Sequence, residues 1–223
     1  MTATELFEIS GLTLRIAALA TCLALPPAVG LGYILARYSF PGRSLAQAII
    51  ALPMVLPPVA VGLALLFLLG PQGPLSQLLS ASGIQIVFTQ WAAALAAATV
   101  GLPLFVRACQ QAFEGVDRSY PVLARTLGHS RLQVFLLVSL PLARRGILYG
   151  ALLCFTRGLG EFGATALVAG IIPGRTETLS LGIWSRTQWG DDASALTLCA
   201  VSFLLALASM WAAESWLGRG SRS

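Results

Sequence analysis

Long apolar runs dominate this sequence, and the short segments between them carry most of its charges. A helix needs about 20 apolar residues, at 1.5 Å per residue, to cross the roughly 30 Å hydrocarbon core of a bilayer. Only 10% of the residues are charged, whereas a soluble domain carries about 25%. The mean hydropathy of the chain is +0.80. These features predict an all-α integral membrane protein.

Five of the runs are long enough to span a bilayer, and we expect helices at residues 12–36, 45–69, 89–109, 146–172 and 194–217. The second run contains Pro53, Pro57 and Pro58, so we expect it to be kinked or broken there. Five spans do not divide into two matched halves, which disfavours transporters built from inverted repeats. We therefore expect a single membrane domain with its core at about 12–217.

The placement of arginine predicts the orientation of the chain, which has no lysine. If the spans alternate, one side holds most of them: Arg37, Arg43, Arg107, Arg118, Arg125, Arg131, Arg144, Arg145, Arg219 and Arg222. Only Arg175 and Arg186 fall on the other side. Because cytoplasmic loops are rich in arginine, we expect the segment 110–145 and the C-terminus in the cytoplasm and the N-terminus outside. The arginines separate apolar runs, so we expect no nucleic-acid partner.

The segment 110–145 is the only sizeable cytoplasmic piece that we expect, and its sequence predicts two short helices. Asp117 or Ser119 can cap the first helix, and Pro121 fits its first turn. Gly128 can end this helix in a left-handed conformation.

The second helix of this segment is expected to begin after a Ser130 cap and to stop at Pro141. Apolar side chains recur on it at helical spacing: Leu132, Phe135, Leu136 and Leu140. This spacing favours equally an amphipathic helix at the membrane interface and a docking helix for a cytoplasmic partner.

We find no pattern for catalysis, metal binding or nucleotide binding. His129 is the sole histidine, and it has no partner cluster for a metal ion. A chain without lysine cannot contain the phosphate-binding loop GxxxxGK[ST]. We therefore expect this chain to be no enzyme and to bind no cofactor, so that any energy from ATP comes from another polypeptide.

The stretch "ARTLGHSRLQVFLLVSLP", residues 124–141, resembles the cytoplasmic signature of type I ABC importer permeases. Ala124, Gly128, Leu140 and Pro141 occupy signature positions, and Val138 stands where isoleucine is usual. The segments "RYSFPGRSL", "LPMVLPPVAVG", "EGVD", "RGLGEFGAT" and "PGRTETLSLGIW" extend the resemblance to the molybdate permease subgroup over residues 12–217. In one respect the sequence departs from the signature, because Val122 and Leu123 replace its leading acidic residue and alanine.

The resemblance implies that the segment 110–145 docks into a cleft of a separate ATPase subunit and transmits its closure. The positions implied in this coupling are Glu114, Asp117, Pro121, Ala124, Arg125, Gly128, Ser130, Arg131, Leu140 and Pro141. Arg125 and Arg131 are either partners for acidic groups of the ATPase or ordinary arginines of a cytoplasmic loop.

Arg157 and Glu161 stand in an apolar run, where each charge costs roughly 2.5–3.5 kcal/mol on insertion scales. They are four residues apart, so on a helix they share a face and can pair. Two interpretations follow: an internal ion pair that fixes helix packing, or a face on the translocation path. In the second interpretation, Phe162 or Thr165 lies near a gate.

By resemblance, the chain is the transport subunit of a bacterial ABC importer in the inner membrane, with molybdate as its expected substrate. Tungstate or sulfate, with the same role for the chain, is the alternative, followed by a stand-alone secondary transporter. The expected partners are a second copy of the chain, two ATPase subunits that hold ATP and Mg²⁺, an extracytoplasmic oxyanion-binding protein and membrane lipid. Arg175 and Arg186 are candidate contacts for the acidic surface of the binding protein.

Overall fold

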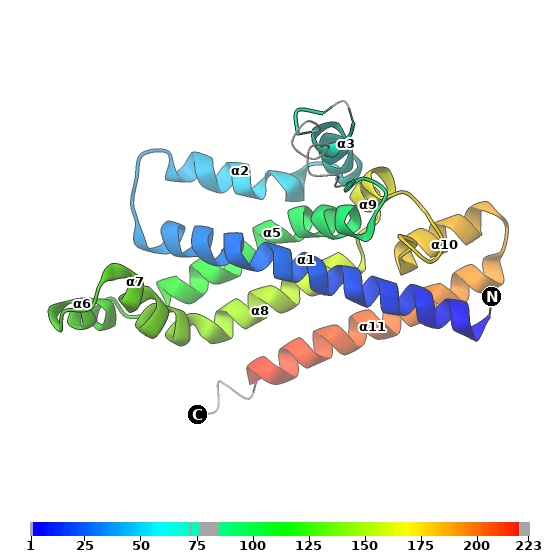
Figure 1. Ribbon diagram of the computed structural model, residues 1–223. Helices are drawn as coiled ribbons and strands as arrows, with labels where there is room; N and C mark the ends of the chain where they lie inside the picture. Colours follow the sequence, from blue (N-terminus) through cyan, green and yellow to red (C-terminus); the bar gives the residue numbers. More distant parts are fainter. Residues whose placement is uncertain (1, 72, 76–84, 219–223) are drawn as a thin grey trace.

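Helices make up nearly all of the chain that the computed structural model describes, which comprises residues 2–71, 73–75 and 85–218 (Figure 1). The first half contains α1 (Ala3–Arg37), α2 (Arg43–Val55), α3 (Pro58–Leu69) and α5 (Gln90–Glu114). The second half contains α6 (Ser119–Thr126), α7 (Arg131–Val134), the π-helical turn η1 (Phe135–Ser139), α8 (Leu140–Leu159), α9 (Gly163–Val168), α10 (Leu179–Gln188) and α11 (Asp192–Gly218). The predicted all-α fold is confirmed.

Four helices of the described residues are long and apolar enough to cross a membrane: Ala3–Arg37, Gln90–Glu114, Arg131–Leu159 and Asp192–Ala212. The pair α2 and α3 qualifies as a fifth span if the two bent halves count as one. The chain is therefore a multi-pass membrane protein, and the expected number of five spans depends on this bent pair.

The predicted break in the second run lies at consecutive prolines. α2 ends at Val55, α3 begins at Pro58, and their axes differ by 107°. Leu56 and Pro57, which each precede a proline, have extended backbone conformations because the following ring disfavours the helical region. Pro58 starts α3, where its missing N–H costs nothing.

The fourth predicted span, 146–172, is wrong at both ends. The helical stretch starts at Arg131, where α7 runs through η1 into α8, and it ends at Leu159. Gly160 to Phe162 then interrupt the helix before α9 begins at Gly163. The apolar run hides this interruption, because hydropathy does not register a break in the backbone.

Pro141 does not stop the second helix of the segment 110–145, contrary to the prediction. It lies in the first turn of α8, directly after η1. A π-helical turn accommodates the proline because its i→i+5 hydrogen bonding displaces the carbonyl that the ring would otherwise meet. The segment from α7 to α8 is consequently one continuous helical rod.

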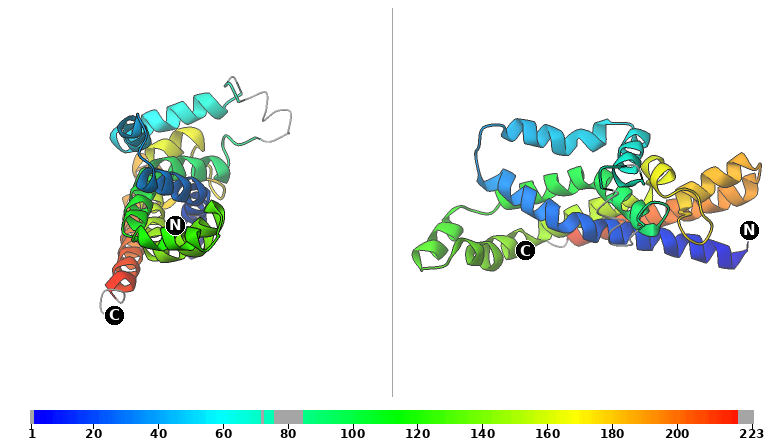
Figure 2. Two further views of the ribbon diagram at one scale, coloured as in Figure 1. Left: turned by 90° about the vertical axis from the view of Figure 1, so that its left-hand side faces the viewer. Right: turned by 45° about the horizontal axis from the view of Figure 1, so that its top comes forward.

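The best-packed part of the chain surrounds α5, which lies against both α1 and α8 (Figures 1 and 2). Phe105, Cys109 and Phe113 of α5 are completely buried in this core. Nearer its start, α5 buries a run of alanines: Ala92, Ala93, Ala94, Ala96 and Ala97. Such small side chains let helix backbones approach closely, which is how helices pack in lipid.

A second close approach joins α3 to α9. A Cβ atom added at Gly62 would lie 2.7 Å from both the Cα and the carbonyl oxygen of Ala164. A Cβ atom added at Gly163 would lie 2.9 Å from the Cβ of Pro58. The bent pair is thus anchored through α3 to the short helix that follows the interruption after α8.

Gly62→Ala should destabilise the protein, because the new methyl group meets backbone atoms of α9 that cannot move aside alone. Overpacking of this kind costs about 1–3 kcal/mol. Thermal unfolding of the purified protein in detergent should show a lowered midpoint. Gly30→Ala is the matched control, because an added Cβ there has no neighbour within 4 Å, and its midpoint should be unchanged or raised. Equal midpoints for the two variants would refute the close packing of α3 on α9.

Candidate functional site

Helix α6 projects from one end of the bundle, opposite the N-terminus (Figure 1). Its start is fixed by Asp117, whose Oδ1 accepts a hydrogen bond of 2.8 Å from the Ser119 backbone N–H. Hydrogen bonds from Ser119 lower the pKa of the Asp117 carboxyl, since they favour its charged form. The N-cap position is Arg118, which makes no side-chain capping bond, so neither predicted cap occupies it; Asp117 supplies its hydrogen bond from one residue earlier. Pro121 lies in the first turn as expected.

Gly128 ends α6 with a backbone φ of +91°, as predicted. The N–H of His129 donates to the Ala124 carbonyl, and the N–H of Gly128 donates to the Arg125 carbonyl. This pair of hydrogen bonds is the Schellman arrangement, which requires a left-handed residue after the helix. The turn between α6 and α7 is consequently fixed by backbone geometry.

Helix α7 begins at a capping box, of which only the Ser130 cap was predicted. Ser130 Oγ accepts from the Gln133 N–H, and Gln133 Oε1 accepts from the Ser130 N–H at 2.8 Å. The Ser130-x-x-Gln133 spacing was the available signal for the second half of this box.

The expected apolar face of the second helix divides in the structure. Phe135 and Leu140 pack against the core around α5, whereas Leu132 and Leu136 remain exposed. With α6 and the intervening turn, the exposed side chains form an apolar surface at the end of the molecule, which we call the α6–α7 surface. Its members are Tyr120, Val122, Leu123, Leu127, Leu132 and Leu136. Exposed apolar surfaces of this kind mark interaction sites.

The charged residues expected in coupling have different environments. Arg125 and Arg131 are exposed near the α6–α7 surface, so their side chains are accessible to a partner. Glu114 instead bonds within the chain: its Oε1 accepts from Gln110 Nε2 at 2.8 Å and lies 3.4 Å from Arg43 Nη2.

Arg157 and Glu161 do pair, although they do not share one helix as predicted. Arg157 lies in the last turn of α8 and Glu161 in the interruption that follows. Arg157 Nη2 is 2.9 Å from Glu161 Oε2, while Glu161 Oε1 accepts a hydrogen bond of 3.0 Å from the Ala164 N–H. The Glu161 side chain is 2% exposed and that of Arg157 is 32% exposed. The carboxylate therefore joins the end of α8 to the start of α9.

The two neighbours expected near a gate have separate contacts. The ring of Phe162 packs against Trp184 of α10, with 5.6 Å between ring centroids. Thr165 lies inside α9 and is 1% exposed. The structure thus brings Phe162 and Glu161 together at the interruption, while the Thr165 side chain is enclosed within the chain.

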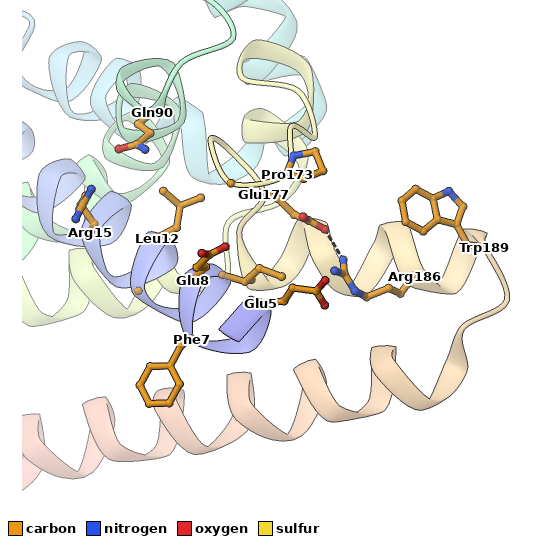
Figure 3. Close-up of a pocket in the computed structure, with 13 residues that line it drawn as sticks. Glu5, Phe7, Glu8, Leu12, Arg15, Gln90, Pro173, Glu177, Arg186 and Trp189 are labelled. Atoms are coloured by element: carbon orange, nitrogen blue, oxygen red, sulfur yellow. Dashed lines mark hydrogen bonds and ion pairs between the residues drawn. The ribbon is translucent and has the colours of Figure 1, made fainter. Parts of the chain in front are cut away.

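A cavity of about 700 Å³ opens at the N-terminal end of the molecule (Figure 3). Its charged lining comes from Glu5, Glu8 and Arg15 of α1, together with Glu177 and Arg186. Arg186 forms an ion pair with Glu177, and both side chains are largely buried. Of the two candidate contacts for the binding protein, Arg186 is therefore ruled out, because its charge is paired and buried within the chain. Arg175 lies in the nearby turn and is exposed.

Comparison with known proteins gives the same family for nearly the whole chain. Residues 28–219 match the family model described as "Binding-protein-dependent transport system inner membrane component". The molybdenum transport system permease protein ModB of Escherichia coli K12 is 41% identical over 213 residues, which cover 95% of this chain and 93% of that protein. The sulfate transport system permease protein CysT of Salmonella typhimurium is 38% identical over 192 residues, covering 85% and 69% respectively.

The fold also has a counterpart among solved structures. A chain of the MetNI methionine ABC transporter, in an inward-facing conformation, superposes with a TM-score of 0.71. The match covers 96% of this chain and 97% of the other at 15% identity. At this identity the likeness concerns the fold alone.

Arg157→Ala should destabilise the protein more than the double replacement Arg157→Ala/Glu161→Gln. The single change leaves a buried carboxylate without its cation, whereas glutamine can still accept the Ala164 hydrogen bond without a charge. Because Arg157 is one-third exposed, we expect a loss of only about 1–3 kcal/mol for the single variant. Thermal unfolding in detergent, followed by tryptophan fluorescence, measures the difference. The interpretation as a packing pair fails if the double variant is the less stable one; Arg175→Ala serves as an exposed control.

Proposed function

Because the chain belongs to the family of binding-protein-dependent transport system inner membrane components, we propose that it is the membrane-spanning permease subunit of a bacterial ABC importer for molybdate. The identity to a permease named for molybdenum transport, over almost the full length of both chains, supports this substrate. Sulfate is the second candidate, because the sulfate permease relative is also similar but covers less of its own length. Tungstate shares the shape and charge of both oxyanions.

The observation that carries this proposal is the α6–α7 surface. It exposes apolar side chains on a segment held rigidly by a Schellman turn and a capping box. A rigid projection with an apolar surface suits a helix-in-groove contact with a partner protein. We propose that this partner is the ATPase subunit, that two copies of it bind, and that they hold the ATP and Mg²⁺.

The composition of the chain also favours a separate ATPase. Transport against a gradient needs a coupled energy source, and the sequence contains no lysine from which to build a phosphate-binding loop. Binding of ATP to the partner would then bias a switch between two conformations of the permease.

The proposed assembly is a homodimer with the path for the oxyanion on its two-fold axis, because five spans enclose too little space for such a path. The α6–α7 end would face the cytoplasm, where most arginines are expected. α11 runs from the N-terminal end of the molecule back toward the α6–α7 end (Figure 1), so the C-terminus would be cytoplasmic. An extracytoplasmic binding protein would deliver the substrate at the opposite end, near the exposed Arg175.

Within this dimer, we place the switching region at the interruption between α8 and α9. Glu161 holds the two helices together, and α3 packs on α9 directly beside it. Arg157 is the most accessible charge there, and the adjacent carboxylate opposes tight binding of an oxyanion. We therefore propose that Arg157 and Glu161 fix the packing of helices beside the translocation path and do not form a substrate site.

The decisive experiment measures radiolabelled molybdate uptake into proteoliposomes that contain this chain, its ATPase and its binding protein. The expected result is ATP-dependent uptake that vanishes when the ATPase is omitted. Excess unlabelled sulfate and tungstate, added separately, rank the three oxyanions as substrates. Uptake by this chain alone, driven by an ion gradient, would identify a secondary transporter instead and would contradict the proposal.

Gly128→Val should uncouple ATP hydrolysis from uptake while membrane insertion remains normal. Valine at a φ of +91° is strained by about 1–3 kcal/mol, which would reshape the turn between α6 and α7. The measurement is uptake per ATP hydrolysed in the reconstituted complex. Gly30→Val is the matched control, because Gly30 lies within α1, has no positive φ, and an added Cβ there has no neighbour within 4 Å. Normal coupling in the Gly128 variant would count against the docking role of this segment.

A further inference from the structure

Two arginines at the ends of the α1–α2 loop contact the junction between α5 and α6. Arg37, the last residue of α1, donates a hydrogen bond of 2.9 Å from Nη2 to the Val116 carbonyl. Arg43, the first residue of α2, places Nη2 3.4 Å from Glu114 Oε1. We call these two contacts the arginine clip. They join both sides of the loop to the point where the α6–α7 segment leaves the bundle.

Two glutamines extend the clip along α2 and α5. Gln110 Nε2 donates to Glu114 Oε1 at 2.8 Å, and Gln47 Nε2 donates to Gln110 Oε1 at 3.4 Å. Gln110 is 7% exposed, so this part of the network is shielded from solvent. Glu114 Oε1 thus receives hydrogen bonds from both α2 and α5.

Apart from this network and Ile50, which packs against the core around α5, α2 is held loosely within a single chain. None of its residues is fully buried, and Leu45, Ile49 and Leu52 are exposed. At its far end, α2 leads through the 107° bend into α3, which packs on α9. A helix with polar contacts at one end and a packed continuation at the other can transmit displacement along its axis.

We propose that the arginine clip carries displacement of the α6–α7 segment to α2, as a second route beside the continuous rod of α7, η1 and α8. Glu114 is then a positioning residue that acts within the chain, rather than a contact for the ATPase. Both routes end at α9: the rod through Glu161, and α2 through the packing of α3. This inference rests on the proposed function, because the displacement originates in the ATPase.

The exposure of the ion pair decides how the clip is best tested. Arg43 and Glu114 are 37% and 45% exposed, and surface pairs contribute little when one partner is merely neutralised. Reversal of one charge adds repulsion to the lost attraction, so it perturbs the clip more strongly. Reversal of both charges restores the attraction with the partners exchanged.

The test compares Arg43→Glu, Glu114→Arg and the double reversal in the reconstituted complex with its ATPase and binding protein. Each single reversal should lower molybdate uptake per ATP hydrolysed by about 2- to 10-fold, the scale of coupling contacts. The double reversal should recover most of the wild-type ratio. Gln111→Arg is the control, because it adds an arginine on the exposed last turn of α5, and its ratio should equal that of wild type.

Two outcomes would contradict the proposed role of the arginine clip. Normal ratios in both single variants would mean that the contact transmits nothing. Impaired single variants that the double reversal does not rescue would mean that Glu114 acts on the ATPase. Co-purification with the ATPase verifies assembly of each variant. If a reversal prevents assembly, Glu114→Ala replaces it, because it removes the acceptor for both Arg43 and Gln110, and a wild-type ratio there is again contrary to the proposal. Absence of ATP-dependent uptake in the wild-type complex would refute the proposed function instead, so the two failures are distinguishable.

Discussion

Close contact between backbones at small side chains is the constraint on which this molecule depends. Lipid tails are as apolar as the side chains, so transfer of an apolar side chain from lipid to a helix interface releases no hydrophobic free energy. Helices in a membrane therefore associate through van der Waals contact and interhelical hydrogen bonds. The alanines of α5 serve this purpose, and so does Gly32 of α1, where an added Cβ would lie 2.5 Å from the Cβ of Cys109. α1, α5 and α8 consequently form a tight unit that can move as one body.

The remaining elements are attached to this unit at few points. α2 has no fully buried residue, α3 is held mainly by α9, and α11 exposes apolar side chains such as Leu196 and Phe203. Exposed apolar surface on these helices suits lipid or a second copy of the chain. A rigid unit with loosely attached helices is the arrangement that a rigid-body switch between two conformations requires.

The sequence predicted this arrangement where local chemistry decides it. Proline at positions 57 and 58 and glycine at position 128 each limit the backbone to a narrow region, so the bend and the turn were foreseen. The prediction from sequence was wrong where the backbone departs from regular helix geometry inside an apolar run. The π-helical turn that accommodates Pro141 leaves no mark in hydropathy, and the apolar run that contains Glu161 suggested an unbroken helix.

The interruption at Glu161 allows α9 to move separately from α8, which the proposed coupling requires. α8 is 20 residues long, about 30 Å at 1.5 Å per residue, and together with α7 and η1 it joins the α6–α7 surface to the interruption without a loop. A tilt imposed at one end would therefore appear at the other, where the Glu161 carboxylate links α8 to α9. An unbroken helix through residues 146–172 would have moved α9 rigidly with α8. The interruption lets α9 follow α3 instead, so the position of α2 can influence α9 independently of the rod.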